Sequence, residues 1–117
     1  MKIEDVLKLA RPNILGLEAY STARDDCGSN LPEIFLDANE NPYNNGINRY
    51  PDPHQKALKS RISEIKGIAA GSLFLGNGSD EAIDLVYRVF CVPGASNAVS
   101  IAPSYGMYEV AAAMNDI

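Results

Sequence analysis

The sequence predicts an α/β protein: an N-terminal arm followed by the beginning of a mostly parallel sheet that is incomplete in this chain. Helix and strand patterns alternate through residues 53–117, which is typical of parallel strands joined by crossover helices. Residues 1–52 are irregular and rich in Pro, Gly and Asn, so we expect them to form the arm. No apolar run approaches the roughly 20 residues needed to cross a bilayer, so no membrane span is expected.

The composition is that of a soluble globular protein and excludes several function classes. Of the 117 residues, 46 % are hydrophobic and 21 % are charged, so extensive disorder is not expected. A net charge of −5 without a basic cluster argues against a nucleic-acid partner. Glu4 and Asp5 stand where a signal peptide needs an apolar core, so a cytoplasmic protein is expected. Cys27 and Cys91 are compatible with one disulfide or two free thiols, and with a single His they predict no metal site.

The first half of the chain contains one expected helix and one strand-like piece. Apolar residues at helical spacing predict a short amphipathic helix over Ile3–Leu9. Pro12 is expected to end it, because the residue before a proline is disfavoured in the α region. Ile34–Leu36 alone reads as a strand among the turn formers that follow. Such a long irregular run is unusual in a compact domain, so we expect a functional arm or a segment that packs on a partner.

The second half of the sequence alternates between helix patterns and strand patterns. The expected order is helix, strand, helix, strand, helix, over residues 54–66, 73–75, 80–90, 98–101 and 106–114. Gly67 is expected to cap the first of these helices, and Pro93-Gly94 to form a turn. Parallel sheets are buried on both faces and need several strands, so two strands are too few. The chain therefore resembles the first third of a larger α/β protein.

The clearest candidate for chemistry is the stretch Leu75-Gly76-Asn77-Gly78-Ser79-Asp80-Glu81-Ala82, between an expected strand and a helix. Free backbone N–H groups and the helix dipole make such a junction a binding site for anions. Glu81 stands where the dinucleotide fingerprint has its third glycine, and no Gly-Lys-Ser/Thr follows. A phosphate bound here would therefore be a monophosphate. The alternative is a plain strand-to-helix turn.

A second strand-to-helix junction carries Tyr105, within Ala102-Pro103-Ser104-Tyr105-Gly106. Ligands of open α/β sheets bind outside the carboxyl ends of the strands. There Tyr105 could stack on a flat ring, or it could be an ordinary core or surface aromatic residue. Both junctions are expected at the same edge of the sheet, which favours one shared site.

Two polar, proline-fixed segments lie in the arm, at residues 37–42 and 48–53. Binding residues concentrate in such loops, so the segments are either a docking arm or a surface connection. His54, the one histidine, is a candidate general base or a surface residue that caps a helix. No Gly-x-Ser-x-Gly motif occurs, so a nucleophilic triad has no support.

Four segments together resemble the histidinol-phosphate aminotransferase family, in the class I/II aminotransferase group of fold-type I pyridoxal-phosphate enzymes. They are Leu36-Asp37-Ala38-Asn39-Glu40-Asn41-Pro42, Asn48-Arg49-Tyr50-Pro51-Asp52-Pro53, Gly76-Asn77-Gly78-Ser79-Asp80-Glu81 and Pro103-Ser104-Tyr105-Gly106-Met107-Tyr108. The resemblance runs from Met1 to Ile117. The first two segments are fairly specific for the family, whereas the third is shared with many relatives.

The resemblance implies a fold, a cofactor and a set of site residues. Residues 1–52 would be an N-terminal arm and small-domain segment, and residues 53–117 the start of the large domain that binds pyridoxal 5′-phosphate. Backbone N–H groups of Ser79 and Asp80 would bind the cofactor phosphate, with Gly78 permitting the approach, and Tyr105 would stack on the pyridine ring.

Two further tyrosines are implicated by the same resemblance. Tyr50 would reach the cofactor phosphate of the neighbouring subunit in a homodimer. Tyr20 would contact the small-molecule substrate, although Ser21 and Thr22 follow it where the family often has proline and glycine. No residue of this chain is assigned to catalysis.

The chain lacks the family's Schiff-base lysine. Its five lysines, Lys2, Lys8, Lys56, Lys59 and Lys66, are not in the family's serine–lysine setting. Transamination needs that lysine to hold the cofactor and move a proton, so this segment alone is expected to be inactive. The whole enzyme would interconvert histidinol phosphate and 2-oxoglutarate with imidazole-acetol phosphate and glutamate. The alternatives are another fold-type I enzyme, such as a related aminotransferase or a decarboxylase, and a binding fragment without catalysis.

Overall fold

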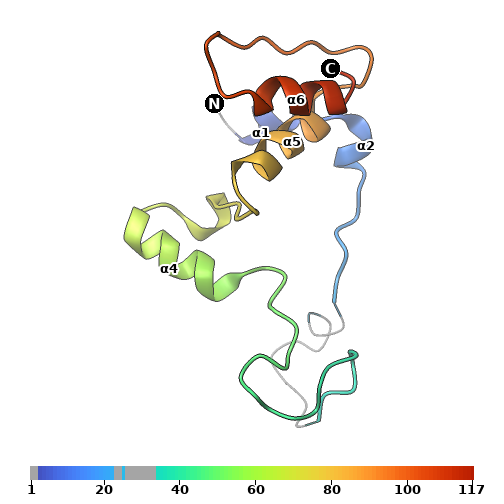
Figure 1. The fold of residues 1–117 in the computed structure, drawn as a ribbon. Coiled ribbons are helices and arrows are strands. Elements are labelled where there is room, and N and C mark those ends of the chain that lie inside the picture. The colour runs from blue at the N-terminus through green and yellow to red at the C-terminus, as the bar shows by residue number, and fades with distance from the viewer. Residues whose placement is uncertain (1–2, 23–24, 26–33) are drawn as a thin grey trace. The chain divides into compact units, whose positions relative to one another are not determined.

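A computed structural model describes residues 3–22, 25 and 34–117 of the chain (Figure 1). The chain divides into two compact units, residues 1–18 with 76–117 and residues 19–75. Within the described residues, no helix is long and apolar enough to cross a membrane.

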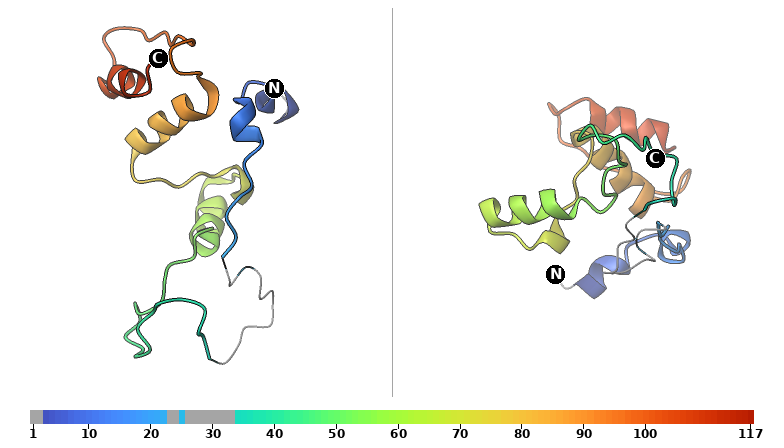
Figure 2. Two further views of the ribbon diagram at one scale, coloured as in Figure 1. Left: turned by 90° about the vertical axis from the view of Figure 1, so that its right-hand side faces the viewer. Right: turned by 90° about the horizontal axis from the view of Figure 1, so that it is seen from below.

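The first unit is organised around a pair of helices, α5 (Ser79–Phe90) and α6 (Met107–Met114). Figures 1 and 2 show α6, in red, beside α5, in orange, and the two helices contact each other. Ala111 of α6 is 1 % exposed. The Tyr87 hydroxyl of α5 donates to the Tyr108 carbonyl at 3.1 Å. Apolar packing and one polar bridge thus join the two helices.

A second polar bridge joins the same helices at Asp84. The Asn115 side-chain amide, just after α6, donates to Asp84 Oδ1 at 2.7 Å, and Arg88 pairs with Asp84 Oδ2 at 2.6 Å. Asn115 first and then Arg88 lower the pKa of Asp84, because both donate to its charged form. The end of α6 is thereby attached to the middle of α5.

The N-terminal residues of this unit form α1 (Ile3–Leu7) and α2 (Pro12–Leu15). The N–H of Arg11 donates to the Val89 carbonyl at 2.9 Å, and its Nη1 donates to the Arg88 carbonyl at 3.0 Å. The last carbonyls of a helix lack partners inside it and carry partial negative charge. Arg11 therefore caps the C-terminus of α5.

The second unit contains α4 (Lys56–Lys66) and the 3₁₀ turn η1 (Ala70–Ser72), which contact each other. Asp52 precedes α4 and accepts from the N–H groups of His54 at 2.9 Å and Lys56 at 2.8 Å. The Lys56 bond and then the His54 bond lower the pKa of Asp52. Gly67 ends α4 in the left-handed region, at φ 64°.

The helices predicted from the sequence are confirmed, with ends shifted by one or two residues. The first ends at Leu7 rather than Leu9, and the third begins at Ser79 rather than Asp80. The cap at Gly67 and a turn at Gly94 are also present. Helix α2 is not among the helices expected from the sequence, because Pro12 predicts only the end of the first helix. Proline is tolerated in the first turn of a helix, where its missing N–H would lack a partner in any case.

None of the three predicted strands forms within the described residues. Segments 34–36, 73–75 and 98–101 carry no β-ladder. A strand requires backbone hydrogen bonds to a neighbour, and no described segment supplies them. Val99 is 96 % exposed and Leu36 is 91 % exposed, so their apolar side chains are almost entirely accessible to solvent.

Cys91 is a half-buried free thiol. Cys27 lies outside the described residues, and so does Lys2.

Candidate functional site

The start of α5 is open because its capping position is a glycine. Gly78 has φ 85° and ψ 179°, a backbone conformation essentially reserved for glycine. It carries no side chain to cap the helix, so the first N–H groups of α5, from Ser79 and Asp80, have no acceptor within the helix. A Cβ added at Gly78 would meet nothing within 4 Å, so the space beside these donors is free. The helix dipole adds a partial positive charge there.

Glu81 fixes the loop that leads into α5. Its carboxylate reaches back to accept from the backbone N–H of Asn77, and from the Asn77 side-chain amide at 3.2 Å. This resembles a capping box, in which a glutamate in the first helical turn satisfies a donor that precedes it. Glu81 thus fixes the loop at Asn77, while Ser79 and Asp80 provide the free N–H groups.

Tyr105 is attached to the same helix end. Its hydroxyl donates to Asp80 Oδ1 at 3.1 Å, although the two residues are 25 positions apart. This hydrogen bond, together with the negative charge of Asp80, raises the pKa of Tyr105 above its ordinary value of 10.0. Tyr108 meets the Tyr105 ring edge-on, with 6.3 Å between ring centroids. The half-exposed Tyr105 ring therefore stands beside the N-terminus of α5, held at its hydroxyl and at one edge.

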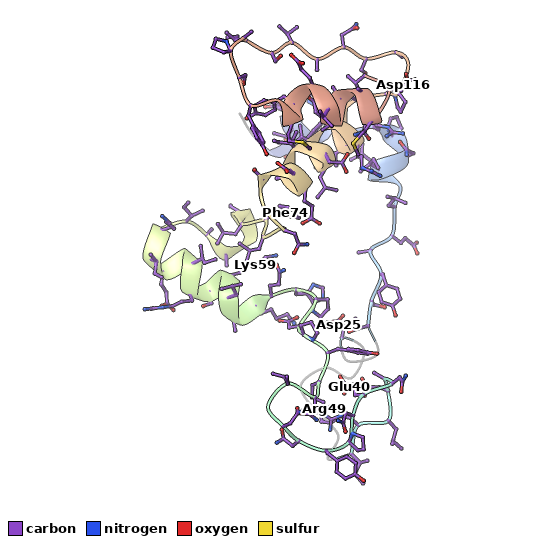
Figure 3. All side chains as sticks on the ribbon, in the orientation of Figure 1. Asp25, Glu40, Arg49, Lys59, Phe74 and Asp116 are labelled. Carbon is purple, nitrogen blue, oxygen red and sulfur yellow. The ribbon has the colours of Figure 1, made fainter. Side chains whose placement is uncertain are left out.

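A second constellation lies in the loop from Asn39 to Tyr50, in the other unit. The Tyr50 hydroxyl donates to the Asn39 carbonyl at 3.1 Å. The Tyr50 backbone N–H donates to Glu40 Oε1 at 2.7 Å, and Arg49 pairs with Glu40 Oε2 at 2.8 Å. Figure 3 shows Glu40 and Arg49 together in this loop. The loop is therefore closed on itself around one carboxylate.

A smaller polar cluster involves His54. Its Nε2 lies 3.1 Å from Asp25 Oδ1, while Asp25 Oδ2 accepts from the N–H of Thr22 at 3.0 Å and from its hydroxyl at 2.8 Å. The Thr22 bonds are the main cause, and His54 a lesser one, of a pKa for Asp25 of about 2 instead of 3.8. The cluster ties Asp25 to the start of α4.

Comparison with known proteins assigns the family. The aminotransferase class I and II family matches residues 13–117, which is most of the chain. The chain belongs to this aminotransferase family. It is 58 % identical over 110 residues to a histidinol-phosphate aminotransferase of Bacteroides fragilis, an alignment that covers 94 % of the chain and 32 % of that protein.

Two further relatives carry the same name. A histidinol-phosphate aminotransferase of Christiangramia forsetii is 50 % identical over 118 residues, covering 100 % of the chain and 34 % of the relative. One of Parabacteroides distasonis is 56 % identical over 115 residues, covering 98 % and 33 %. This aminotransferase-family chain therefore spans about a third of the length of the curated relatives it matches.

The site residues predicted from the sequence lie in two different units of the chain. The first unit brings together Gly78, Ser79, Asp80 and Tyr105 at the start of α5. Tyr50 and Tyr20 belong to the second unit, where Tyr20 is 88 % exposed.

Sequence reasoning did not find the roles of three carboxylates. Glu40 closes the loop of Tyr50, Asp80 holds the Tyr105 hydroxyl through its side chain, and Glu81 fixes Asn77. For Glu81 a signal exists, since glutamate in the first helical turn is a known capping residue. Glu40 and Asp80 act on residues whose proximity depends on the folded loop.

Proposed function

We propose that this chain is the N-terminal third of a pyridoxal-phosphate-dependent aminotransferase that interconverts histidinol phosphate and 2-oxoglutarate with imidazole-acetol phosphate and glutamate. The observation that carries the proposal is the open N-terminus of α5 at Gly78, with the Tyr105 ring beside it. Family membership and the shared name of the relatives supply the reaction and the substrate. The proposed location is the cytoplasm.

The residues at the start of α5 fit pyridoxal 5′-phosphate on chemical grounds. A phosphate monoester needs several N–H donors and positive potential, which Ser79, Asp80 and the helix dipole offer. The ring of the cofactor needs a flat apolar partner, which Tyr105 offers. The free space at Gly78 leaves room for phosphate oxygens to approach the backbone.

Each residue would then have one task. Ser79 and Asp80 bind the phosphate through their N–H groups, and Tyr105 orients the ring through stacking while its hydroxyl stays on Asp80. When bound, the cofactor would supply an electron sink for the bond broken at the carbon that bears the amino group. Asp80 accepts the hydrogen bond of the Tyr105 hydroxyl, and that contact raises the pKa of Tyr105.

Tyr50 and Tyr20 complete the proposed site. Tyr50 donates its hydroxyl to the cofactor phosphate of a second subunit in a homodimer, and Tyr20 contacts the substrate. The Schiff-base lysine is supplied by a part of the protein other than these residues. Four of the five lysines are described, and three of those, Lys56, Lys59 and Lys66, belong to α4, while Lys8 lies 3.7 Å from Asp5.

The proposed fold is that of fold-type I transferases. Residues 1–52 form the arm and small-domain segment, and residues 53–117 begin the large domain. Segments 73–75 and 98–101 become strands of a mostly parallel sheet when they meet strands of the remaining polypeptide. The exposure of Val99 at 96 % and Ile101 at 86 % supports this, because such residues favour buried strands.

The decisive test begins with the intact mass of the native gene product. A mass about three times the 12.6 kDa of this chain is expected, since the chain covers 32 % of a relative. That complete polypeptide is then assayed with histidinol phosphate and 2-oxoglutarate, and glutamate formation is expected. Glutamate formation only with other amino donors would assign a related aminotransferase, and release of carbon dioxide would assign a decarboxylase.

A second candidate function is a binding fragment without catalysis, favoured by the absence of a lysine in the family's setting. A native mass near 12.6 kDa would support it and overturn the aminotransferase proposal. Robust transamination by the 117-residue chain would contradict the expectation that this segment alone is inactive.

A further inference from the structure

The loop from Asn39 to Tyr50 is organised by one nearly buried carboxylate. The Glu40 side chain is 3 % exposed, and both of its oxygens are used. Oε1 accepts from the Tyr50 backbone N–H at 2.7 Å, and Oε2 accepts from Arg49 Nη1 at 2.8 Å. Glu40 therefore joins the beginning of the loop to its end, across ten positions of sequence.

Arg49 is held on its other side as well. Its guanidinium lies over the Phe35 ring, with 5.1 Å between Cζ and the ring centroid. A planar guanidinium can pair with a carboxylate in its plane and with an aromatic ring at its face, which a lysine cannot imitate. Arg49 thus links Glu40 to the Phe35 ring, and Glu40 in turn accepts from the Tyr50 backbone N–H.

The middle of the loop is closed by asparagines. The Asn48 side chain donates to the Asn41 carbonyl at 3.0 Å. Asn41, Asn44 and Asn45 each accept, through the side-chain oxygen, from the backbone N–H two residues further on. Such Asx turns restrict the backbone locally. The loop is thus shaped by its own polar side chains rather than by a hydrophobic core.

Tyr50 is one of the exposed residues of this loop. It is 59 % exposed, while its hydroxyl donates to the Asn39 carbonyl at 3.1 Å. A phenol has one proton, so it donates to one acceptor at a time. An anionic oxygen is a stronger acceptor than a neutral carbonyl, so a phosphate within reach would take this hydrogen bond over.

We propose that Glu40 is the positioning residue of Tyr50: it fixes the Tyr50 backbone so that the hydroxyl, resting on the Asn39 carbonyl, can transfer its hydrogen bond to a phosphate monoester. This inference rests on the proposed function, in which that phosphate belongs to the cofactor. The inference adds Glu40 to the residues of the proposed site. Its side chain touches neither cofactor nor substrate and acts through Tyr50.

The substitution Glu40→Gln distinguishes a role in positioning Tyr50 from a general contribution to folding stability. Tyr50 and Arg49 donate to different oxygens of Glu40, and glutamine has an NH₂ group in place of one of them. One of these two donors is left facing another donor, which loosens the Tyr50 backbone. Glu64→Gln is the matched control, because Glu64 pairs with Arg61 at the same 2.8 Å but is 61 % exposed.

The experiment measures equilibrium binding of pyridoxal 5′-phosphate and of pyridoxal, which lacks the phosphate, to the complete polypeptide by coenzyme absorbance. We expect Glu40→Gln to bind pyridoxal 5′-phosphate about tenfold more weakly, as for the loss of one charge-assisted hydrogen bond. Binding of pyridoxal should not change, and Glu64→Gln should match the wild type for both compounds. In a Tyr50→Phe background, Glu40→Gln should cause no further loss.

Three results would overturn the role of Glu40 while leaving the proposed function intact. They are wild-type affinity in Glu40→Gln, an equal loss for both compounds, and a full additional loss in the Tyr50→Phe background. If the wild type binds no pyridoxal 5′-phosphate, the proposed function fails and the role of Glu40 falls with it. Thermal unfolding shows whether Glu40→Gln is folded. If it is not, Glu40→Asp, which keeps two acceptor oxygens, is tested with the same expected selectivity for the phosphate and a smaller loss.

Discussion

The start of α5 and the loop from Asn39 to Tyr50 present a tyrosine and polar groups by different physical means. At α5, the donors are backbone N–H groups that any helix start exposes, and the required element is one glycine at φ 85°. In the loop, Tyr50 depends on a carboxylate that is 3 % exposed and on the two donors that it satisfies. The first arrangement is sensitive to backbone conformation, and the second to the chemistry of a single side chain.

The largest expected effect is at Gly78. Gly78→Ala places a Cβ in a conformation essentially reserved for glycine, so we expect the free energy of unfolding to fall by about 3 kcal/mol. Binding of pyridoxal 5′-phosphate should weaken with it. Thermal and chemical unfolding of the complete polypeptide measure the loss.

The control for this prediction is Gly71→Ala. Neither glycine has an atom within 4 Å of an added Cβ, but only Gly78 has a positive φ. The control should therefore change stability by no more than about 1 kcal/mol. Equal effects at both positions would mean that the conformation of Gly78 carries no strain.

The next largest effect is on stability at Glu40. We expect Glu40→Gln to lower the free energy of unfolding by about 2 kcal/mol, because it leaves a shielded donor unpaired. Glu64→Gln, in an exposed ion pair, should cost no more than about 0.5 kcal/mol. Urea unfolding compares the two variants. A similar cost for both would show that burial of Glu40 does not matter.

A smaller effect is expected on the titration of Tyr105. Its pKa is raised by Asp80, so the hydrogen bond between them is present below the ordinary pKa of 10.0 and is lost as the pH rises through the higher folded value. Asp80→Asn removes the charge and should bring the pKa of Tyr105 back toward 10.0. The difference in absorbance between the protein and its Tyr105→Phe variant follows this ionisation. An unchanged midpoint in Asp80→Asn would contradict the contact.

A second effect on titration concerns Asp25. Its pKa is lowered to about 2, so the bonds that it makes are present above 3.8 and are lost as the pH falls through about 2. Thr22→Val should raise the pKa of Asp25 more than His54→Phe or His54→Asn does. Thr22→Val removes only the hydroxyl bond to Asp25 and leaves the bond from the Thr22 backbone N–H in place. Carbon NMR of the Asp25 carboxyl gives the midpoint. A larger rise on replacing His54 would reverse the assigned order.

Much of the helical structure could be predicted from the sequence. The predicted sheet differs, because its strands need neighbours that the described residues do not supply. Helices α4 and α5 follow local rules: an apolar stripe, acids in the first turn of α5 and a glycine after Lys66. Helix α2 was missed because Pro12 is compatible with both a stop and a start. Segment 98–101 has the composition of a strand, but a strand exists only when a neighbour completes its hydrogen bonds.

The sequence by itself determined helices α1, α4, α5 and α6, the open turn at Gly78 and the motifs that place the chain in its family, because these depend on residues close together in the chain. The tertiary structure alone decided the contacts of Asp80 with Tyr105 and of Glu40 with Tyr50, which span 25 and 10 positions. Nothing in residue type or spacing indicates which carboxylate a distant hydroxyl or N–H will meet. That pairing is set by how the chain folds back, since a hydrogen bond requires its two atoms to lie within about 3 Å of each other.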